Sequence, residues 1–107
     1  MTQRQVVLRA LASSDIDDAV AYLRDSAGEA VARAFIDSLE TAINRITRSP
    51  NSGSPRFGFD LGIPDLRATG LKRFPYAIFY VTIDERIDIW RVLHTRRDVP
   101  RTFSDID

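Results

Sequence analysis

The hydrophobic pattern of this chain changes its period once, near Leu66, and this change most restricts the possible fold. Before that point, apolar residues recur at the three- and four-residue spacing of amphipathic helices. After it, apolar residues follow the period of two that is typical of β-strands. A helical first half followed by a strand-rich second half predicts an α+β fold in which helices cover one face of an antiparallel sheet.

Two helices are predicted in the first half. The segment 14–17, Ser-Asp-Ile-Asp, indicates a helix start, because a serine can accept from a free first-turn N–H and acidic residues suit the positive end of the helix dipole. The apolar stripe that follows stops at Gly28, which can end a helix. A second helix is expected from about Glu29 to Arg48, before the Ser-Pro pair at 49–50. The connection is so short that the helices must form an antiparallel hairpin.

The remaining segments predict strands. The β-branched run 5–9 is expected to be an opening strand that joins the sheet. Strands are also expected at 66–71, 76–82 and 87–93, and the short turn 84–86 makes the last two pair antiparallel. The segment 51–64 contains Gly, Pro and Ser and is expected to be a loop.

The expected architecture is therefore β-α-α-β-β-β: an N-terminal strand, an α-helical hairpin, then a three-stranded antiparallel sheet. A length of 107 residues favours a single domain spanning residues 1–107. The charged segment 94–107 contains a proline and is expected to be a tail over the surface.

Composition excludes several classes of protein. The chain has no cysteine and one histidine, which excludes a disulfide framework, a thiolate metal site and a cysteine nucleophile. It has no glycine-rich phosphate loop and no dinucleotide fingerprint, so we expect neither a metal nor a cofactor. It has no apolar run long enough for a signal peptide or a membrane span, so we expect no membrane partner and a cytoplasmic location.

Charge is balanced overall but uneven along the chain. Residues 1–40 hold 7 Asp and Glu against 4 Lys and Arg, whereas residues 41–107 hold 8 against 11. The net charge of zero is far from the strongly basic profile of a dedicated nucleic-acid binder. We therefore expect no direct, sequence-specific binding of nucleic acid.

The candidate functional residues gather at the end of the last predicted strand. Because neighbouring antiparallel strands place one strand's start beside the other's end, basic residues from two segments could meet there in a cationic patch around an imidazole. The alternative is an ordinary solvated strand end, in which Arg97 pairs with Asp98 and Arg91 braces the sheet. Four aromatic residues nearby, Tyr76, Phe79, Tyr80 and Trp90, are expected in the core and on the sheet faces. The candidates are Lys72, Arg73, Arg91, His94, Arg96 and Arg97.

Two strings resemble a known family. Residues 74–80 are Phe-Pro-Tyr-Ala-Ile-Phe-Tyr, and residues 87–98 are Ile-Asp-Ile-Trp-Arg-Val-Leu-His-Thr-Arg-Arg-Asp. They resemble the RelE/ParE superfamily of toxins from type II toxin–antitoxin systems, and the run from Arg91 to Asp98 is most similar to the ParE branch. The resemblance implies a non-enzymatic toxin that inhibits DNA gyrase and blocks replication. It also implies neutralisation by a cognate, ParD-like antitoxin protein.

Two alternatives remain open at this point. The RelE branch implies a metal-independent, ribosome-dependent messenger-RNA endonuclease, in which Arg91 would stabilise charge and His94 would act as acid or base. The chain departs from that branch, because Thr95 replaces the aromatic residue that some members have after this histidine and because it contains only one lysine. The second alternative is a non-toxic remnant that only binds antitoxin. The sequence does not identify the antitoxin-binding residues, and a helix groove and the edge strands near 5–9 and 66–71 are both open to it.

Overall fold

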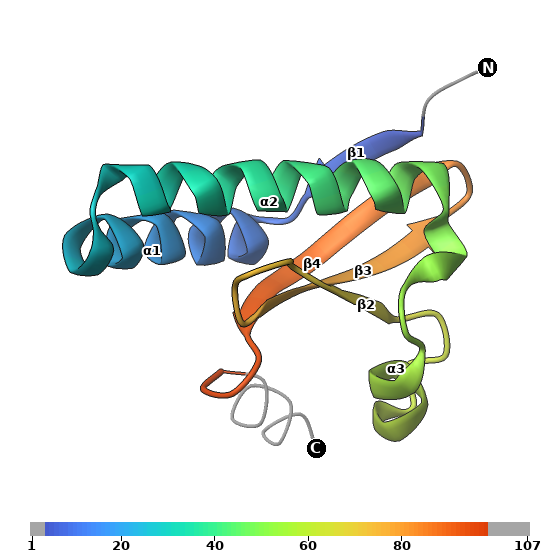
Figure 1. Cartoon of the computed structure of the whole chain (residues 1–107). Coiled ribbons are helices and arrows are strands. Elements are labelled where there is room, and N and C mark those ends of the chain that lie inside the picture. The colour runs from blue at the N-terminus through green and yellow to red at the C-terminus, as the bar shows by residue number, and fades with distance from the viewer. Residues whose placement is uncertain (1–3, 99–107) are drawn as a thin grey trace.

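The structure is a computed structural model that describes residues 4–98 (Figure 1). Three helices, one short 3₁₀ turn and four strands follow one another along the chain. Their order confirms the predicted α+β architecture of a strand, a helical hairpin and further strands. Their bounds are β1 Gln5–Leu8, α1 Ala10–Ala27, α2 Glu29–Arg48, η1 Pro50–Ser52, α3 Arg56–Leu61, β2 Arg67–Gly70, β3 Tyr76–Ile83 and β4 Arg86–His94.

The four strands form one sheet in the order β1-β4-β3-β2. The strands β2, β3 and β4 pair antiparallel, as expected. The N-terminal strand β1 joins the sheet beside β4 and runs parallel to it, so that Val6 lies opposite Ile87. The opening strand thus joins the sheet, as expected, and adds a fourth strand to the predicted antiparallel group of three.

The helices α1 and α2 form the predicted hairpin and lie side by side across one face of the sheet (Figure 1). Gly28 is the one residue between them, and its φ of 98° is a conformation that glycine adopts without strain. The predicted start of the first helix at 14–17 is wrong by about one turn, because α1 begins at Ala10. The backbone N–H of Arg9 donates to Ile89, so the chain passes from the end of β1 directly into the helix without a side-chain cap.

Both faces of the sheet are covered. On the hairpin side, Phe35, Leu39 and Ile46 of α2 pack with Ile78, Ile87 and Ile89 of the sheet. On the opposite face, a second cluster gathers Leu66, Phe79 and Leu93 against residues of the segment after α2. This second cluster explains why six consecutive residues of β3, 76–81, are buried.

The segment 51–64 is more ordered than the predicted loop. It contains the end of η1 and the six-residue helix α3. Tyr80 fixes the start of this segment, because its buried hydroxyl donates to the Pro50 carbonyl at 2.6 Å and accepts from the Gly53 N–H at 3.1 Å. The aromatic residue Phe57 then packs edge to face on Phe79. The predicted loop therefore contains a helix that the sequence analysis did not predict.

A bulge in β4 sets the direction of the residues that follow it. Phe79 lies opposite Arg91 and Tyr80 lies opposite Ile89, so Trp90 is an extra residue in the ladder. The extra residue reverses the alternation of the strand. As a result Val92 packs in the hairpin-side core together with Ile89, three residues before it.

No helix within residues 4–98 is both long enough and apolar enough to cross a membrane.

Candidate functional site

Arg91 binds Asp15 in a two-pronged ion pair that joins β4 to α1. Its Nε donates to Asp15 Oδ2 at 2.8 Å and its Nη2 donates to Oδ1 at 2.9 Å. The same Oδ2 accepts from the Val92 backbone N–H at 3.0 Å. The hydrogen bond to Asp15 is the main reason that the pKa of Arg91 is raised above its ordinary value. Parallel N–H···O bonds of this kind fix geometry as well as charge, so Arg91 is a brace between helix and strand.

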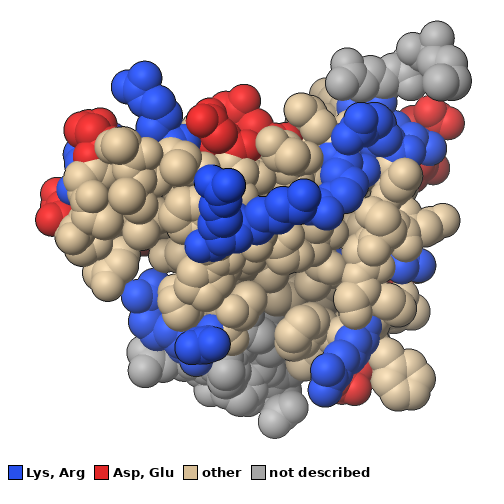
Figure 2. Space-filling view, in the orientation of Figure 1, with Lys and Arg blue, Asp and Glu red and all other residues tan. Residues whose placement is uncertain are grey.

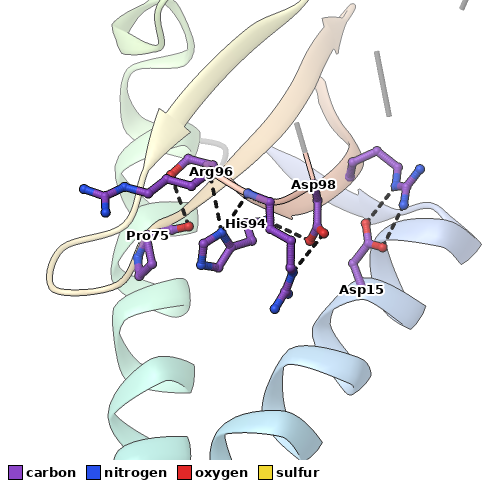
Figure 3. A network of polar contacts seen from close by, with 8 residues as sticks. Asp15, Pro75, His94, Arg96 and Asp98 are labelled. Atoms are coloured by element: carbon purple, nitrogen blue, oxygen red, sulfur yellow. Dashed lines mark hydrogen bonds and ion pairs between the residues drawn. The ribbon is translucent and has the colours of Figure 1, made fainter. Parts of the chain in front are cut away.

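His94 organises the turn that follows β4 (Figure 3). Its Nδ1 accepts from the backbone N–H groups of Arg96 at 3.3 Å and Arg97 at 3.1 Å. Its own backbone N–H donates to Asp98 Oδ2, and its carbonyl accepts from the Asp98 N–H at 2.9 Å. The imidazole also packs edge to face on Tyr76, with 5.2 Å between ring centroids. Because Nδ1 accepts two backbone hydrogen bonds, the imidazole side chain holds this turn in place.

Thr95 ties the same turn to the loop between β2 and β3. Its N–H and its hydroxyl both donate to the Pro75 carbonyl, at 2.8 Å and 3.2 Å (Figure 3). The turn 95–98 is therefore held both from within and from the neighbouring loop, although it lies at the surface.

Arg97 forms the expected contact with its neighbour. Its Nε donates to Asp98 Oδ1 at 3.1 Å, and its guanidinium lies 5.6 Å from the centre of the Tyr22 ring of α1. The hydrogen bond to Asp98 raises the pKa of Arg97. Burial alone would raise the pKa of Asp98, but the hydrogen bonds from Arg97 and from the His94 backbone outweigh burial, so that pKa is lowered.

Arg96 has a different environment from Arg91 and Arg97. It is exposed, and its guanidinium has no hydrogen bond or ion pair to another described residue. Of the three arginines between positions 91 and 97, Arg91 forms an ion pair with Asp15, and the half-exposed Arg97 forms one with Asp98. The Arg96 side chain faces solvent.

The structure divides the predicted cationic patch into two parts. Lys72 and Arg73 lie on the β2–β3 loop, as expected, but they line a hollow against α2 together with Arg45. Arg91 and Arg97 line another hollow of about 300 Å³ against α1, with Asp15, Asp18 and Tyr76. Within residues 4–98, no hydrogen bond or ion pair joins Lys72 or Arg73 to His94, Arg96 or Arg97.

Sequence reasoning missed two residues, one in each of these hollows. Asp15 was interpreted as part of a helix start, whereas it lies inside α1 and pairs with a residue 76 positions later. Arg45 was not among the candidates, because a basic residue in the last turn of a helix has the local explanation of the helix dipole. No local signal marks either residue, since both depend on how the hairpin lies on the sheet.

The described residues offer no metal site. Among residues 4–98, no three His, Cys, Asp or Glu side chains lie close enough to hold a metal ion. The expected tail 94–107 is described only as far as Asp98: His94 ends β4 and 95–98 form the turn, while residues 99–107 lie outside the described part.

Comparison with known families decides which proteins this chain resembles. The family model described as ParE toxin of type II toxin-antitoxin system, parDE, matches residues 6–99. The chain belongs to the ParE toxin family. It is 31% identical over 80 residues to proteins named Toxin ParE2 from two strains of Mycobacterium tuberculosis, a match that covers 75% of this chain and 70% of each relative.

A solved structure shares the fold of this ParE-family chain. It is titled "Chromosomal ParDE TA system from P. aeruginosa", and it superposes with a TM-score of 0.71 at 17% sequence identity. The match covers 86% of this chain and 96% of that one. The match of the family model over residues 6–99 confirms the predicted identification with the ParE branch of toxins, and this solved structure shows that the fold is shared.

Proposed function

We propose that this ParE-family chain inhibits bacterial DNA gyrase by binding it, and that a cognate antitoxin blocks this activity in the cytoplasm. Membership of the family supports the proposal, together with the match to a structure whose title names a ParDE system. The observation that carries it is the turn 95–98, which His94 and Thr95 hold in one conformation at the surface. A rigid turn that presents Arg96 and Arg97 is suited to contact a large protein partner.

The geometry favours binding over RNA cleavage. The nuclease alternative needs Arg91 to stabilise charge and His94 to transfer a proton. Arg91 instead donates two hydrogen bonds to Asp15. His94 uses Nδ1 as an acceptor for two backbone N–H groups, which leaves only Nε2 for chemistry. Both side chains thus have structural roles that do not require a reaction.

The antitoxin is proposed to cover the groove between α1 and α2. This groove has a volume of about 590 Å³, and its lining is mainly apolar, with Ile16 and Val20 from α1 and Ile36 and Ile43 from α2. Leu8, at the end of β1, also lines it and is 44% exposed. An apolar helix laid into such a groove is a common mode of peptide recognition.

The free edge of β1 extends this surface. The sheet has two edge strands, β1 and β2, and part of β2 is already bridged by Ser54, which exchanges two backbone hydrogen bonds with Ala68. The edge of β1 has no such cover among the described residues. A segment that leaves the groove past Leu8 can therefore add a strand beside β1.

The charged variant Ile36→Glu tests the groove, because it places a carboxylate on this apolar surface. We expect the affinity for the antitoxin encoded beside the toxin gene to fall at least about tenfold by calorimetry. The variant Leu11→Glu is the control, since Leu11 is 60% exposed and lies outside the groove. Equal affinities for the two variants would contradict this placement of the antitoxin.

A supercoiling assay tests the proposed function itself. Purified gyrase, ATP and relaxed plasmid are incubated with the free toxin, and supercoiled and cleaved plasmid are measured on a gel. We expect supercoiling to fall and cleaved plasmid to accumulate, and equimolar antitoxin to reverse both effects. Unchanged supercoiling at high toxin excess, with the fold verified by circular dichroism, would contradict the proposal. Cleavage of ribosome-bound messenger RNA by the same sample would support the nuclease instead.

A further inference from the structure

The hollow that Lys72, Arg73 and Arg45 line has a volume of about 300 Å³ and lies between α2 and the loop that joins β2 to β3. Three cations line it: Arg45 from the last turn of α2, and Lys72 and Arg73 from the loop. Asp37 is its single acidic residue, so the formal charge of the lining is two units positive. Figure 2 shows Lys and Arg side chains in a band across the face of the molecule on which α2 lies.

The side chains of the three cations form no ion pair with another residue of 4–98. The Nε atom of Arg45 is buried and lacks a hydrogen-bond partner among the described residues. An unpaired, buried guanidinium N–H carries a free-energy cost, since it has lost its water without gaining an acceptor. An incoming oxyanion would supply the missing acceptor.

The loop is held in a fixed position. The Ser38 hydroxyl of α2 donates to the Lys72 carbonyl at 2.9 Å, and the Leu71 N–H donates to the Tyr76 carbonyl at 2.9 Å. Phe74 packs edge to face on Phe35 of α2, with 5.5 Å between ring centroids. The cations of the hollow are therefore attached to a rigid frame.

Arg73 adopts a strained backbone conformation in this loop. Its φ is 71°, in the left-handed region where glycine and asparagine are favoured. The other non-glycine residue with positive φ in residues 4–98 is Asp84, in the tight turn between β3 and β4, where aspartate is tolerated. An arginine at a position suited to glycine costs stability, and such strain concentrates at sites that bind ligands.

We infer that this hollow binds a carboxylate side chain of an acidic protein segment. Guanidinium groups of two arginines and one ammonium group match a carboxylate in charge and geometry. Phe74 and Ala34 give the lining some apolar character, which suits the carbon chain of a glutamate and an apolar neighbour. The inference rests on the proposed function in one respect, namely that the partner is a protein.

Nucleic acid fits the hollow less well. A protein that tracks a phosphate backbone needs several cations along a path and a basic overall charge. Here the lining also contains Asp37, and the net charge of the chain is zero. The hollow accordingly matches one acidic side chain rather than a row of phosphates.

The variant Arg73→Gly separates binding from folding. It removes one cation and releases the strain at φ 71°, so its midpoint of urea unfolding should equal or exceed that of the wild type. The control Arg48→Ala removes an exposed arginine from the same last turn of α2 that does not line the hollow. The probes are a blocked peptide with two adjacent glutamates flanked by leucines, the same peptide with glutamines, and a short oligothymidine.

Binding is followed on the free toxin by NMR, through the Arg45 Nε–H signal and the amide signals of 71–75. We expect saturable shifts with the glutamate peptide, with a Kd of about 1 mM or tighter, and at least about tenfold weaker binding of the glutamine peptide. Arg73→Gly should weaken binding of the glutamate peptide at least about tenfold, whereas Arg48→Ala should leave it unchanged. The absence of saturable shifts, equal binding of both peptides, an unaffected Arg73→Gly, or tighter binding of oligothymidine would each overturn the inference. Since gyrase is absent from this experiment, its outcome is independent of the supercoiling assay.

Discussion

The three arginines at the end of β4 and in the turn after it have different roles, because their surroundings differ. Arg91 donates two hydrogen bonds from one edge of its guanidinium to Asp15, and Arg97 donates one to Asp98. The Arg96 guanidinium has no partner in the described chain. The exposure of these side chains follows the same order, with Arg91 26% exposed and Arg97 50% exposed. A mutation at each position should therefore affect stability and binding in different proportions.

Replacement of Asp15 by alanine should destabilise the fold. It leaves the Arg91 guanidinium and the Val92 N–H without their acceptor in a partly buried position. We expect a loss of about 2–4 kcal/mol, somewhat below the range for fully buried pairs because Arg91 keeps some access to water. Urea unfolding measures the loss. The control Asp18→Ala lies one turn along the same helix, is exposed and should change stability by less than about 0.5 kcal/mol. Similar values for the two variants would contradict the role of Asp15 as a brace.

Asp98 should make stability depend on pH in the acidic range. Its pKa is lower in the folded chain than in the unfolded chain, so its ionised form stabilises the fold. This contribution is complete above the unfolded pKa of about 4 and is lost as pH falls through the folded value. Unfolding curves of wild type and Asp98→Asn, compared between about pH 7 and pH 3, should differ most near neutral pH and converge below about pH 4. A constant difference across this range would contradict the assignment.

At the scale of elements, local patterns predicted most of the fold. The helical periodicity and the Gly28 and Ser49-Pro50 signals gave α2 its correct bounds, and the alternating runs located β3 and β4 to within a residue or two. The errors occur where contacts between residues that are far apart in the sequence determine the structure. The segment 14–17 resembles a helix start, but α1 begins at Ala10. Asp15 lies inside that helix and binds Arg91 of β4, a contact that no local pattern indicates.

The candidate site follows the same rule. Sequence placed His94, Arg96 and Arg97 together, and the structure joins them in one turn because they are near neighbours in the chain. Lys72 and Arg73 separate from them because Ser38 and Phe35 of α2 anchor their loop. The helix α3 was missed since its stability depends on burial against Phe79 rather than on its own short sequence.

The segment after α2 supplies a test at this scale. A Cβ on Gly53 would meet the Tyr80 hydroxyl, which binds Pro50 and Gly53 in the core. Gly53→Ala should therefore displace this ring and cost about 1–3 kcal/mol in urea unfolding. Gly70→Ala is the matched control, because a Cβ there meets no atom within 4 Å, and it should change stability by less than about 0.5 kcal/mol. If both variants unfold at the same urea concentration, Tyr80 does not fix this segment.

At the scale of the whole molecule, the three proposed binding surfaces lie at different places around one sheet. The apolar groove lies between the two helices of the hairpin and continues to β1, at one edge of the sheet. The turn 95–98 lies at the end of β4, beside the loop that carries Pro75. The hollow that contains Arg45 and Arg73 is lined by α2 and that loop. Under the proposed function, the antitoxin and the target would therefore bind different residues of this chain.

The supercoiling activity of gyrase in the presence of the double variant Arg96→Ala/Arg97→Ala is the most direct test of the account. Both side chains are exposed, and the backbone bonds to His94 Nδ1 remain in the variant, so the fold should persist. We predict that the concentration of toxin needed to halve supercoiling rises at least about tenfold, while antitoxin affinity is unchanged. Full inhibition by a folded double variant would contradict the claim that this turn binds gyrase.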